Sequence, residues 1–394
     1  MNKVRNQIQQ GLFILLGVFI PTSIAITNVI IGLLCLCWIL EGNFKSKFDF
    51  IKSSKWMLSI FALIGLYALG MLWGDNHLNA EWQFQRLALL LIFPVLLSME
   101  LKQKTIKRAV MAFLGINFIA AILAILINYN VIQPLYELIF FMKYKWGVSA
   151  FLPYNYHNVL LFFSSCIILF LLLEGKVRYR ALFVVMLLVY AYSIFTELGR
   201  AGQILMIIVS LCYILFYNYK NYMRLIMILF FFITFQAAMY HTSSVYKGRV
   251  DMLSSIVVNK GMKGKAGVED IRYIFVKESV KKILKNPILG YGTGSFGTIF
   301  NNEVDSDYLF YTHTTPHNNY LYVWFELGVL GLILLLSIFY HQIKELFKKQ
   351  FGIHRILLPL SFMFLMLVDS YFFIFTLTVC YIFMYTIYSK YQEE

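Results

Sequence analysis

The chain has 394 residues, of which 60% are hydrophobic and 14% are charged, and its mean hydropathy is +0.70. Apolar runs of membrane-spanning length recur along most of it, which excludes an ordinary soluble domain and predicts an all-α polytopic membrane protein. The formal net charge of +14 does not indicate nucleic-acid binding, because most Lys and Arg residues lie in short clusters between the apolar runs.

Twelve apolar runs predict about twelve transmembrane helices. A span needs roughly 20 apolar residues, and fewer suffice in a tight hairpin. In chain order, the predicted spans cover residues 8–20, 22–40, 55–73, 83–98, 108–127, 157–173, 180–196, 202–217, 223–240, 317–340, 355–369 and 371–389. The chain shows no internal repeat and no low-complexity tract.

The basic residues orient these spans. Lys and Arg gather in every second connection, and the short connections between them hold almost none. By the positive-inside rule, the basic connections and both termini are cytoplasmic. The protein therefore has membrane lipids around it and no nucleic-acid partner.

Two predicted outer segments interrupt the pattern of short loops. Residues 241–316 form one large periplasmic loop, and connections of that length are usually functional. Residues 131–148 are apolar and aromatic but too short and too charged to span, so they predict an interfacial helix. The chain then divides into residues 1–240 with nine spans, the loop 241–316 with helices of its own, and residues 317–394 with three spans.

Ionisable and amide side chains lie at the predicted outer ends of several spans. Ionisable groups within a membrane are costly to bury, so they usually mark a functional site. Each could instead be an interfacial or helix-pairing group. The candidates for substrate binding are Arg86, His157, Asn158, His313, Asn318 and Asp369.

The stretch "FTELGRAGQILM", residues 195–206, predicts a tight outer turn between two spans. It places Arg200 at the N-terminal end of a helix, where free backbone N–H groups already favour an anion. A guanidinium there suits a phosphate. The alternative is an interfacial anchor paired with Glu197.

The loop stretch "VEDIRYIFVKESVKKILKNPILGYGTGSF" predicts a helix from Asp270 to about Lys285. On a helical wheel Arg272 falls in the middle of the apolar arc, where a cation needs an anionic partner from protein or substrate. That arc is made of Phe275, Val276, Val280 and Ile283. The three glycines of "GYGTGSF" permit close backbone approach to a ligand, although the spacing of a phosphate-binding loop is missing.

The stretch "TTPHNNYLYVWFELGVLG", residues 314–331, predicts the start of a span. Thr315 is suited to cap the helix and Pro316 to its first turn, which puts His317 and Asn318 at the N-terminus. The positive end of the helix dipole disfavours imidazolium, so we expect a largely neutral His317 that is able to act as a base.

Two glycines follow on the same predicted helical face. At 100° per residue, Gly328 and Gly331 return to roughly the side of His317, within about 20° and 40°. They would let another helix approach closely and fix the histidine. The alternative is an interfacial histidine with ordinary packing glycines.

Metal and nucleophile motifs are absent from the sequence. It shows no His, Asp or Glu cluster with metal-ligand spacing, and no Ser or Cys nucleophile with a placed base. We therefore expect neither a metal nor another cofactor.

The stretch "HNNYLYVWFELGVLG" has the form His, Asn, nine residues, Gly, two residues, Gly, and it resembles the signature of bacterial O-antigen ligases. The resemblance extends to "GRAGQ", to "DIRYIFVKESVKKILKNPILGYGTGSF" and to the turn at Asp369, over roughly residues 195–371. It implies a GT-C-like glycosyltransferase that moves a glycan from undecaprenyl diphosphate to lipid A core. Arg200 and Arg272 would bind the diphosphate, and His317 would activate the acceptor hydroxyl.

Two other functions stay open on the sequence. O-antigen polymerases share the wider superfamily and use the same donor. A transporter or flippase is the alternative from another class, although its polar groups would lie near the middle of the membrane and its halves would be paired.

Overall fold

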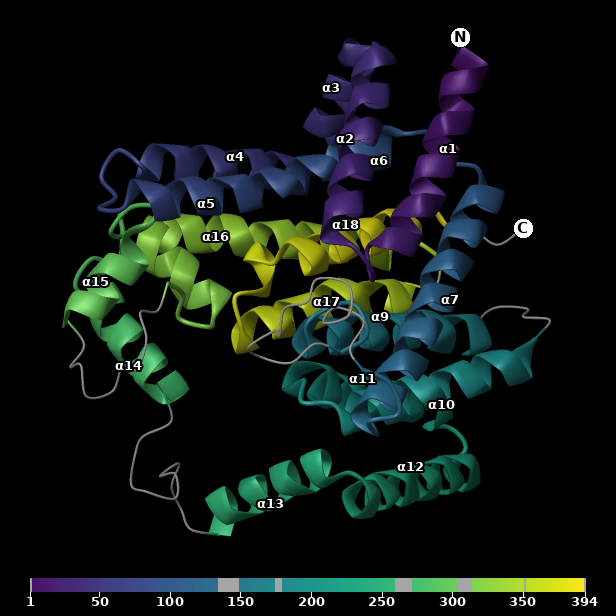
Figure 1. Ribbon diagram of the computed structural model, residues 1–394. Helices are drawn as coiled ribbons and strands as arrows, with labels where there is room; N and C mark the ends of the chain where they lie inside the picture. The colour runs from purple at the N-terminus through teal and green to yellow at the C-terminus, as the bar shows by residue number, and fades with distance from the viewer. Residues whose placement is uncertain are drawn as a thin grey trace.

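The computed structural model describes residues 2–133, 149–173, 179–258, 271–303, 314–350 and 352–392 (Figure 1). Every regular element within those ranges is a helix. Most of the predicted interfacial helix, His313 and the side chain of Arg272 lie outside the described residues.

All twelve predicted apolar segments fall on helices. A residue run rich in Leu, Ile, Phe and Ala keeps its backbone hydrogen bonds internal, and a helix does this within one segment. The helices are α1 (Asn2–Phe19), α2 (Ile24–Leu40), α4 (Lys55–Gly70), α5 (His77–Ala88) with η1 (Leu89–Leu91) and α6 (Ile92–Ser98), α7 (Gln103–Asn128), α9 (Tyr154–Leu173), α10 (Arg180–Thr196), α11 (Arg200–Asn218), α12 (Tyr222–Thr242), α16 (Asn319–Phe347), α17 (Gly352–Val368), and α18 (Phe375–Lys390) after η3 (Tyr371–Phe373).

The predicted count of twelve spans is not reproduced. Within the described ranges, six helices are long and apolar enough to cross a membrane, or up to seven if α2 and α3 (Phe44–Ser53), bent by 113°, form one span. α4, α10 and α17 are apolar but shorter. At 1.5 Å per residue, a 16-residue helix is about 24 Å long, less than the roughly 30 Å hydrocarbon core. The chain is a polytopic α-helical membrane protein.

The bundle is organised around α18. Its residues 375–388 are all buried, as expected for a helix that is apolar on every side. α16 packs against α4 and α17, α1 against α7, and α9 against α10 and α11 (Figure 1).

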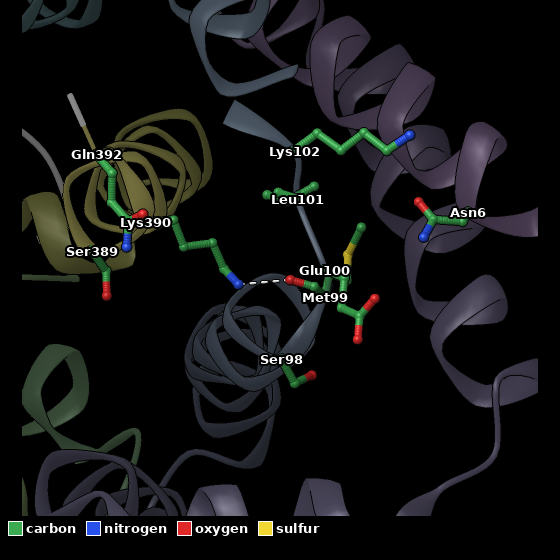
Figure 2. A pocket seen from close by; sticks show the side chains of 9 residues that line it. All are labelled: Asn6, Ser98, Met99, Glu100, Leu101, Lys102, Ser389, Lys390 and Gln392. Atoms are coloured by element: carbon green, nitrogen blue, oxygen red, sulfur yellow. Dashed lines mark hydrogen bonds between the residues drawn. The ribbon is translucent and has the colours of Figure 1, made fainter. Parts of the chain in front are cut away.

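Predicted cytoplasmic connections meet at one end of the bundle. Figure 2 shows a cavity of about 510 Å³ lined by residues from both termini, including Asn6 and Gln392, and by Lys102 from the connection before α7. Lys390 Nζ donates to the Met99 carbonyl over 2.6 Å beside it. The two termini therefore lie together at this end of the bundle, and its cytoplasmic side stays a prediction.

The described parts of the predicted large loop, residues 241–258, 271–303 and 314–316, contain the helices α13 (Ser244–Val258), α14 (Ile271–Ile283) and α15 (Ser295–Glu303), together with the end of α12. The predicted helix in "DIRYIFVKESVKKI" is confirmed as α14. Only two of the four side chains predicted to form its apolar face are buried. These are Phe275 and Ile283, whereas Val276 and Val280 are 43% and 38% exposed. One face of α14 packs against the rest of the protein, and the buried Ser279 lies on that face.

The predicted continuous helix below His317 was wrong, because α16 is broken at Gly328, where φ is +63° and ψ −167°. Gly328 does not admit a neighbouring helix. It lies against the segment that follows α14, and a Cβ at Gly328 would come within 1.8 Å of the Ile288 carbonyl oxygen. Val329 N donates to the Pro287 carbonyl over 2.9 Å, which closes the contact.

The three glycines of "GYGTGSF" also approach protein backbone rather than an open ligand site. Gly290, Gly292 and Gly294 all have positive φ. A Cβ at Gly292 would meet the backbone of Gly74, and one at Gly294 would meet the Asn76 carbonyl. The segment therefore fastens α14 to α4, α5 and α16.

Candidate active site

Three predicted site residues, far apart in the sequence, line one cavity of about 340 Å³. Arg86 comes from α5, His317 from the segment before α16, and Asp369 from the turn between α17 and α18. Asn155 and Tyr156, at the start of α9, line the same cavity. Ile24, at the start of α2, also lines it, so the cavity is built where five separate parts of the chain meet.

His317 and Asp369 form the central contact of this cavity. Nδ1 of His317 lies 2.8 Å from Oδ1 of Asp369, and both side chains are partly exposed. An ionised carboxylate only accepts hydrogen bonds, so Nδ1 carries the proton that it donates to Asp369, and Nε2 is the ring nitrogen that accepts when the imidazole is neutral. This arrangement orients the imidazole as an acceptor for a hydroxyl proton. Asp369 is held in turn by the backbone N–H of Ser370.

The cap of α16 is Asn318, not Thr315 as the sequence predicted. Its Oδ1 accepts from Tyr320 N over 2.9 Å and from Leu321 N over 3.1 Å. Its Nδ2 donates to the Leu367 carbonyl over 3.2 Å, which ties the start of α16 to the end of α17. His317 precedes the cap with φ +52° and does not belong to the helix.

Helix α14 packs directly on the histidine. The rings of Phe275 and His317 have centroids 5.4 Å apart. Arg272 is three residues before Phe275, about one helical turn, on the same helix. In the same cavity, Arg86 is held over the Trp82 ring, with its Cζ 5.5 Å from the ring centroid.

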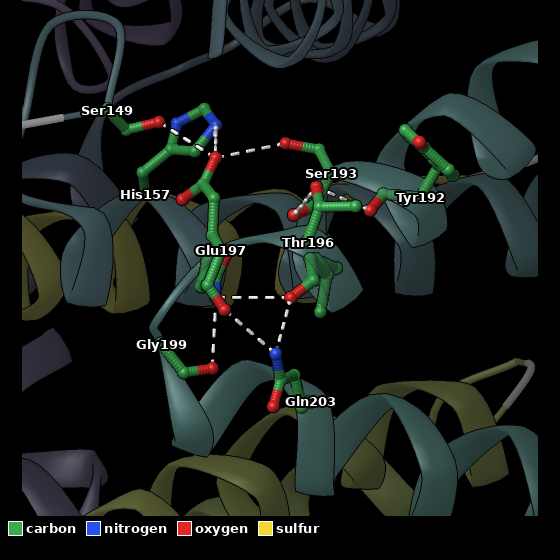
Figure 3. A network of polar contacts seen from close by, with 10 residues as sticks. Ser149, His157, Tyr192, Ser193, Thr196, Glu197, Gly199 and Gln203 are labelled. Carbon is green, nitrogen blue, oxygen red and sulfur yellow. Dashed lines mark hydrogen bonds and ion pairs between the residues drawn. The ribbon is translucent and has the colours of Figure 1, made fainter. Parts of the chain in front are cut away.

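Glu197 anchors a second, buried cluster, shown in Figure 3. Its Oε1 accepts from Ser149 Oγ over 2.8 Å and from Ser193 Oγ over 3.1 Å, and lies 3.5 Å from Nε2 of His157. Burial raises the pKa of Glu197 to about 8, and the two serine hydrogen bonds act in the opposite direction. Within the described residues, Glu197 does not pair with Arg200 as the alternative reading supposed.

His157 and Asn158 are both buried and are not brought together with His317. Asn158 Nδ2 donates to the Gly199 carbonyl over 2.9 Å and so fastens the turn before α11 to α9. A Cβ at Gly199 or Gly202 would come within 2.3 or 2.7 Å of Asn158. The glycines of "GRAGQ" are therefore explained by this close packing.

Arg200 is the first residue of α11, as predicted, and its side chain is exposed. Arg249, from α13, lies near it and was missed by the sequence reasoning. Arg249 Nη1 donates to Gln203 Oε1 over 2.9 Å, and Nη2 donates to the Leu198 carbonyl. Burial and the charge of Arg200 lower the pKa of Arg249 to about 10, while Tyr154 has the opposite effect. No spacing signal in "YKGRVD" singles Arg249 out.

The start of α9 connects the arginine pair to the cavity. The charge interaction of Tyr154 raises the pKa of Arg249, and Tyr154 is followed directly by Asn155 and Tyr156 of the cavity wall.

In the part of the chain that the structure describes, no three His, Cys, Asp or Glu side chains cluster as metal ligands.

Fold and site together define a polytopic helical membrane protein with a polar cavity at the end of the bundle away from its termini. Residues 182–336, which include Arg200, Arg249 and His317, match the family model described as O-Antigen ligase. This match confirms, over these residues, the resemblance found in the sequence.

Two relatives point the same way. The chain is 26% identical over 274 residues to an O-antigen ligase of Salmonella typhimurium, a match that covers 65% of this chain and 60% of that protein. It is 39% identical over 72 residues to a Rickettsia conorii protein provisionally named a polysaccharide ligase, covering 16% and 17% of the two chains. Each match thus covers less than two thirds of the relative's own length.

Proposed function

We propose that the protein is an O-antigen ligase of the bacterial inner membrane. It transfers a glycan from undecaprenyl diphosphate to a sugar hydroxyl of lipid A core, without a metal or other cofactor. The family match and the Salmonella relative support this activity. The cavity faces the periplasm in this proposal, because the opposite end of the bundle gathers the basic connections.

The observation that carries the proposal is the pair formed by His317 and Asp369, 2.8 Å apart at the wall of the cavity. With Nδ1 held by the carboxylate, Nε2 takes the proton of the acceptor hydroxyl. The hydroxyl oxygen bonds to the anomeric carbon while the bond from that carbon to the diphosphate oxygen breaks. The diphosphate leaves with the electron pair, and the anomeric configuration is inverted.

Arginines stabilise the leaving group. Negative charge develops on the diphosphate, and fixed cations in a poorly hydrated site are each able to contribute roughly 3 kcal/mol to lowering the barrier. Arg200 and Arg272 take this role by the family resemblance, and Arg86 adds a cation at the cavity that holds His317. A product that retains the donor's anomeric configuration would contradict direct displacement.

The test replaces His317 with Ala, and Asp369 with Asn, in the native host and separates the lipopolysaccharide on a gel. We expect His317→Ala to leave core without O-chain and to accumulate lipid-linked polymer. Asp369→Asn keeps the size of the side chain but removes the charge that orients the imidazole. It should lower the transfer rate by part of the about 10²- to 10⁴-fold that a general base contributes.

The control is His241→Ala, an exposed histidine at the end of α12. It should leave the O-chain ladder unchanged. Core that carries a single repeat in the His317→Ala strain would instead indicate an O-antigen polymerase. An unchanged ladder in that strain would refute the role of His317 in either enzyme.

A further inference from the structure

Arg200 and Arg249 form a cationic pair that no carboxylate neutralises among the described residues. Neither arginine forms an ion pair there. Glu197, three residues before Arg200, directs its carboxylate to two serines and His157, and Asp251, two residues after Arg249, accepts from the Tyr240 hydroxyl. Arg249 donates to the carbonyl of Leu198, two residues before Arg200, so both cations lie at one turn, where like charges repel and an anion between them is favoured. This pair is therefore a candidate anion site.

The geometry of Arg249 is fixed by the turn that carries Arg200. Its Nη1 and Nη2 donate to Gln203 and to the Leu198 carbonyl. Gln203 Nε2 in turn donates to the carbonyls of Ile194 and Glu197, each over 2.9 Å (Figure 3). A guanidinium has five N–H donors, so three remain on Arg249 after these two hydrogen bonds.

We propose that Arg249 and Arg200 together bind the diphosphate of the lipid-linked donor, with Arg249 supplying the second, rigidly held guanidinium. This inference rests on the proposed function, which provides a lipid diphosphate as substrate. Two forked cations match two adjacent phosphates better than one, because guanidinium binds phosphate oxygens in pairs. The pair then distinguishes a diphosphate from a monophosphate.

Binding of two soluble probes to the purified full chain tests this inference. Farnesyl diphosphate and farnesyl phosphate are titrated calorimetrically in detergent. Loss of a charge-assisted hydrogen-bonding group should weaken farnesyl diphosphate binding about 10- to 100-fold in Arg249→Ala. Farnesyl phosphate should be affected less, so the preference for the diphosphate falls.

Two further variants separate binding from folding. Arg249→Lys keeps the charge without the fork and should recover part of the affinity and of the preference. Lys247→Ala removes an exposed cation of the same helix and should change neither. The inference is overturned if Arg249→Ala binds farnesyl diphosphate as tightly as the unaltered chain. It is also overturned if both probes weaken equally, because a purely structural role of Arg249 predicts that result.

The binding assay and the gel assay fail independently. If the chain binds farnesyl diphosphate through Arg249 but His317→Ala leaves the O-chain ladder intact, the proposed role of His317 is lost and the anion site stands. If His317→Ala abolishes the O-chain while Arg249→Ala binds normally, the ligase assignment stands and the role of Arg249 is lost.

Discussion

Replacing Gly328 with Ala should be among the most damaging small changes in the chain. The backbone there has φ +63° and ψ −167°, a region that only glycine adopts readily. An added Cβ would lie 1.8 Å from the Ile288 carbonyl oxygen, which must retreat by about 1.2 Å to reach the 3.0 Å that such contacts require. The segment after α14 therefore has to move away from α16.

The cost follows from what that movement breaks. Three backbone hydrogen bonds cross the contact: Val329 N to Pro287 O, Tyr291 N to Phe325 O and Gly292 N to Glu326 O, at 2.9, 2.9 and 2.8 Å. Backbone strain of about 1–3 kcal/mol and three hydrogen bonds of about 1 kcal/mol each give a total of about 4–6 kcal/mol. This is a large part of the about 5–15 kcal/mol by which proteins are usually stable.

Thermal unfolding of the purified protein in detergent, followed by tryptophan fluorescence, measures this loss. Gly115→Ala is the control, because Gly115 lies within α7 and has no atom within 4 Å of an added Cβ. It should melt at or slightly above the unaltered protein, since alanine favours a helix over glycine by up to about 1 kcal/mol. If Gly328→Ala has the same melting temperature as Gly115→Ala, the break in α16 is not what holds α14 in place.

Two further predictions concern stability. Asn318→Ala removes the cap of α16 and should lower the free energy of unfolding by about 1 kcal/mol. Asn318→Asp keeps the accepting oxygen but loses the amide that donates to the Leu367 carbonyl, so its melting temperature should fall between those of Asn318→Ala and the unaltered protein in the same assay. Equal losses would argue against capping. Burial places the pKa of Glu197 at about 8 in the folded chain, above its ordinary 4.5. A raised pKa contributes stability that is full below about pH 4.5 and is lost as the pH rises towards 8. The glutamine of Glu197→Gln cannot ionise. The melting temperature of this variant should match that of the unaltered protein near pH 5 and exceed it above pH 8. The opposite order would show that Glu197 is charged when folded.

The helical segments and part of the site could be predicted from the sequence because both depend on local patterns. Apolar runs between basic clusters located the helices, and polar residues at their outer ends located Arg86, His317 and Asp369. The length of each helix was harder to predict from the sequence. Where a helix stops, as α4 does at Gly70, depends on the loop packed against it, and this is why twelve runs did not give twelve full-length spans.

The features that sequence reasoning missed depend on contacts between distant segments. The break at Gly328 exists because residues 287–292 occupy the space a continuous helix would need. Arg249 gains its place only because α13 lies against the turn before α11. Asn318 rather than Thr315 caps α16 because the Leu367 carbonyl accepts its amide, a partner 49 residues away.

The left-handed backbone at His317, with φ +52°, determines which replacements at this position report on chemistry. Asn and Gly adopt this conformation readily, whereas Val, Ile and Thr resist it. In a saturation library, Val and Ile variants should therefore be depleted from the membrane fraction before any question of catalysis arises. Asn and Gly variants should accumulate normally, so that their phenotype isolates the missing imidazole.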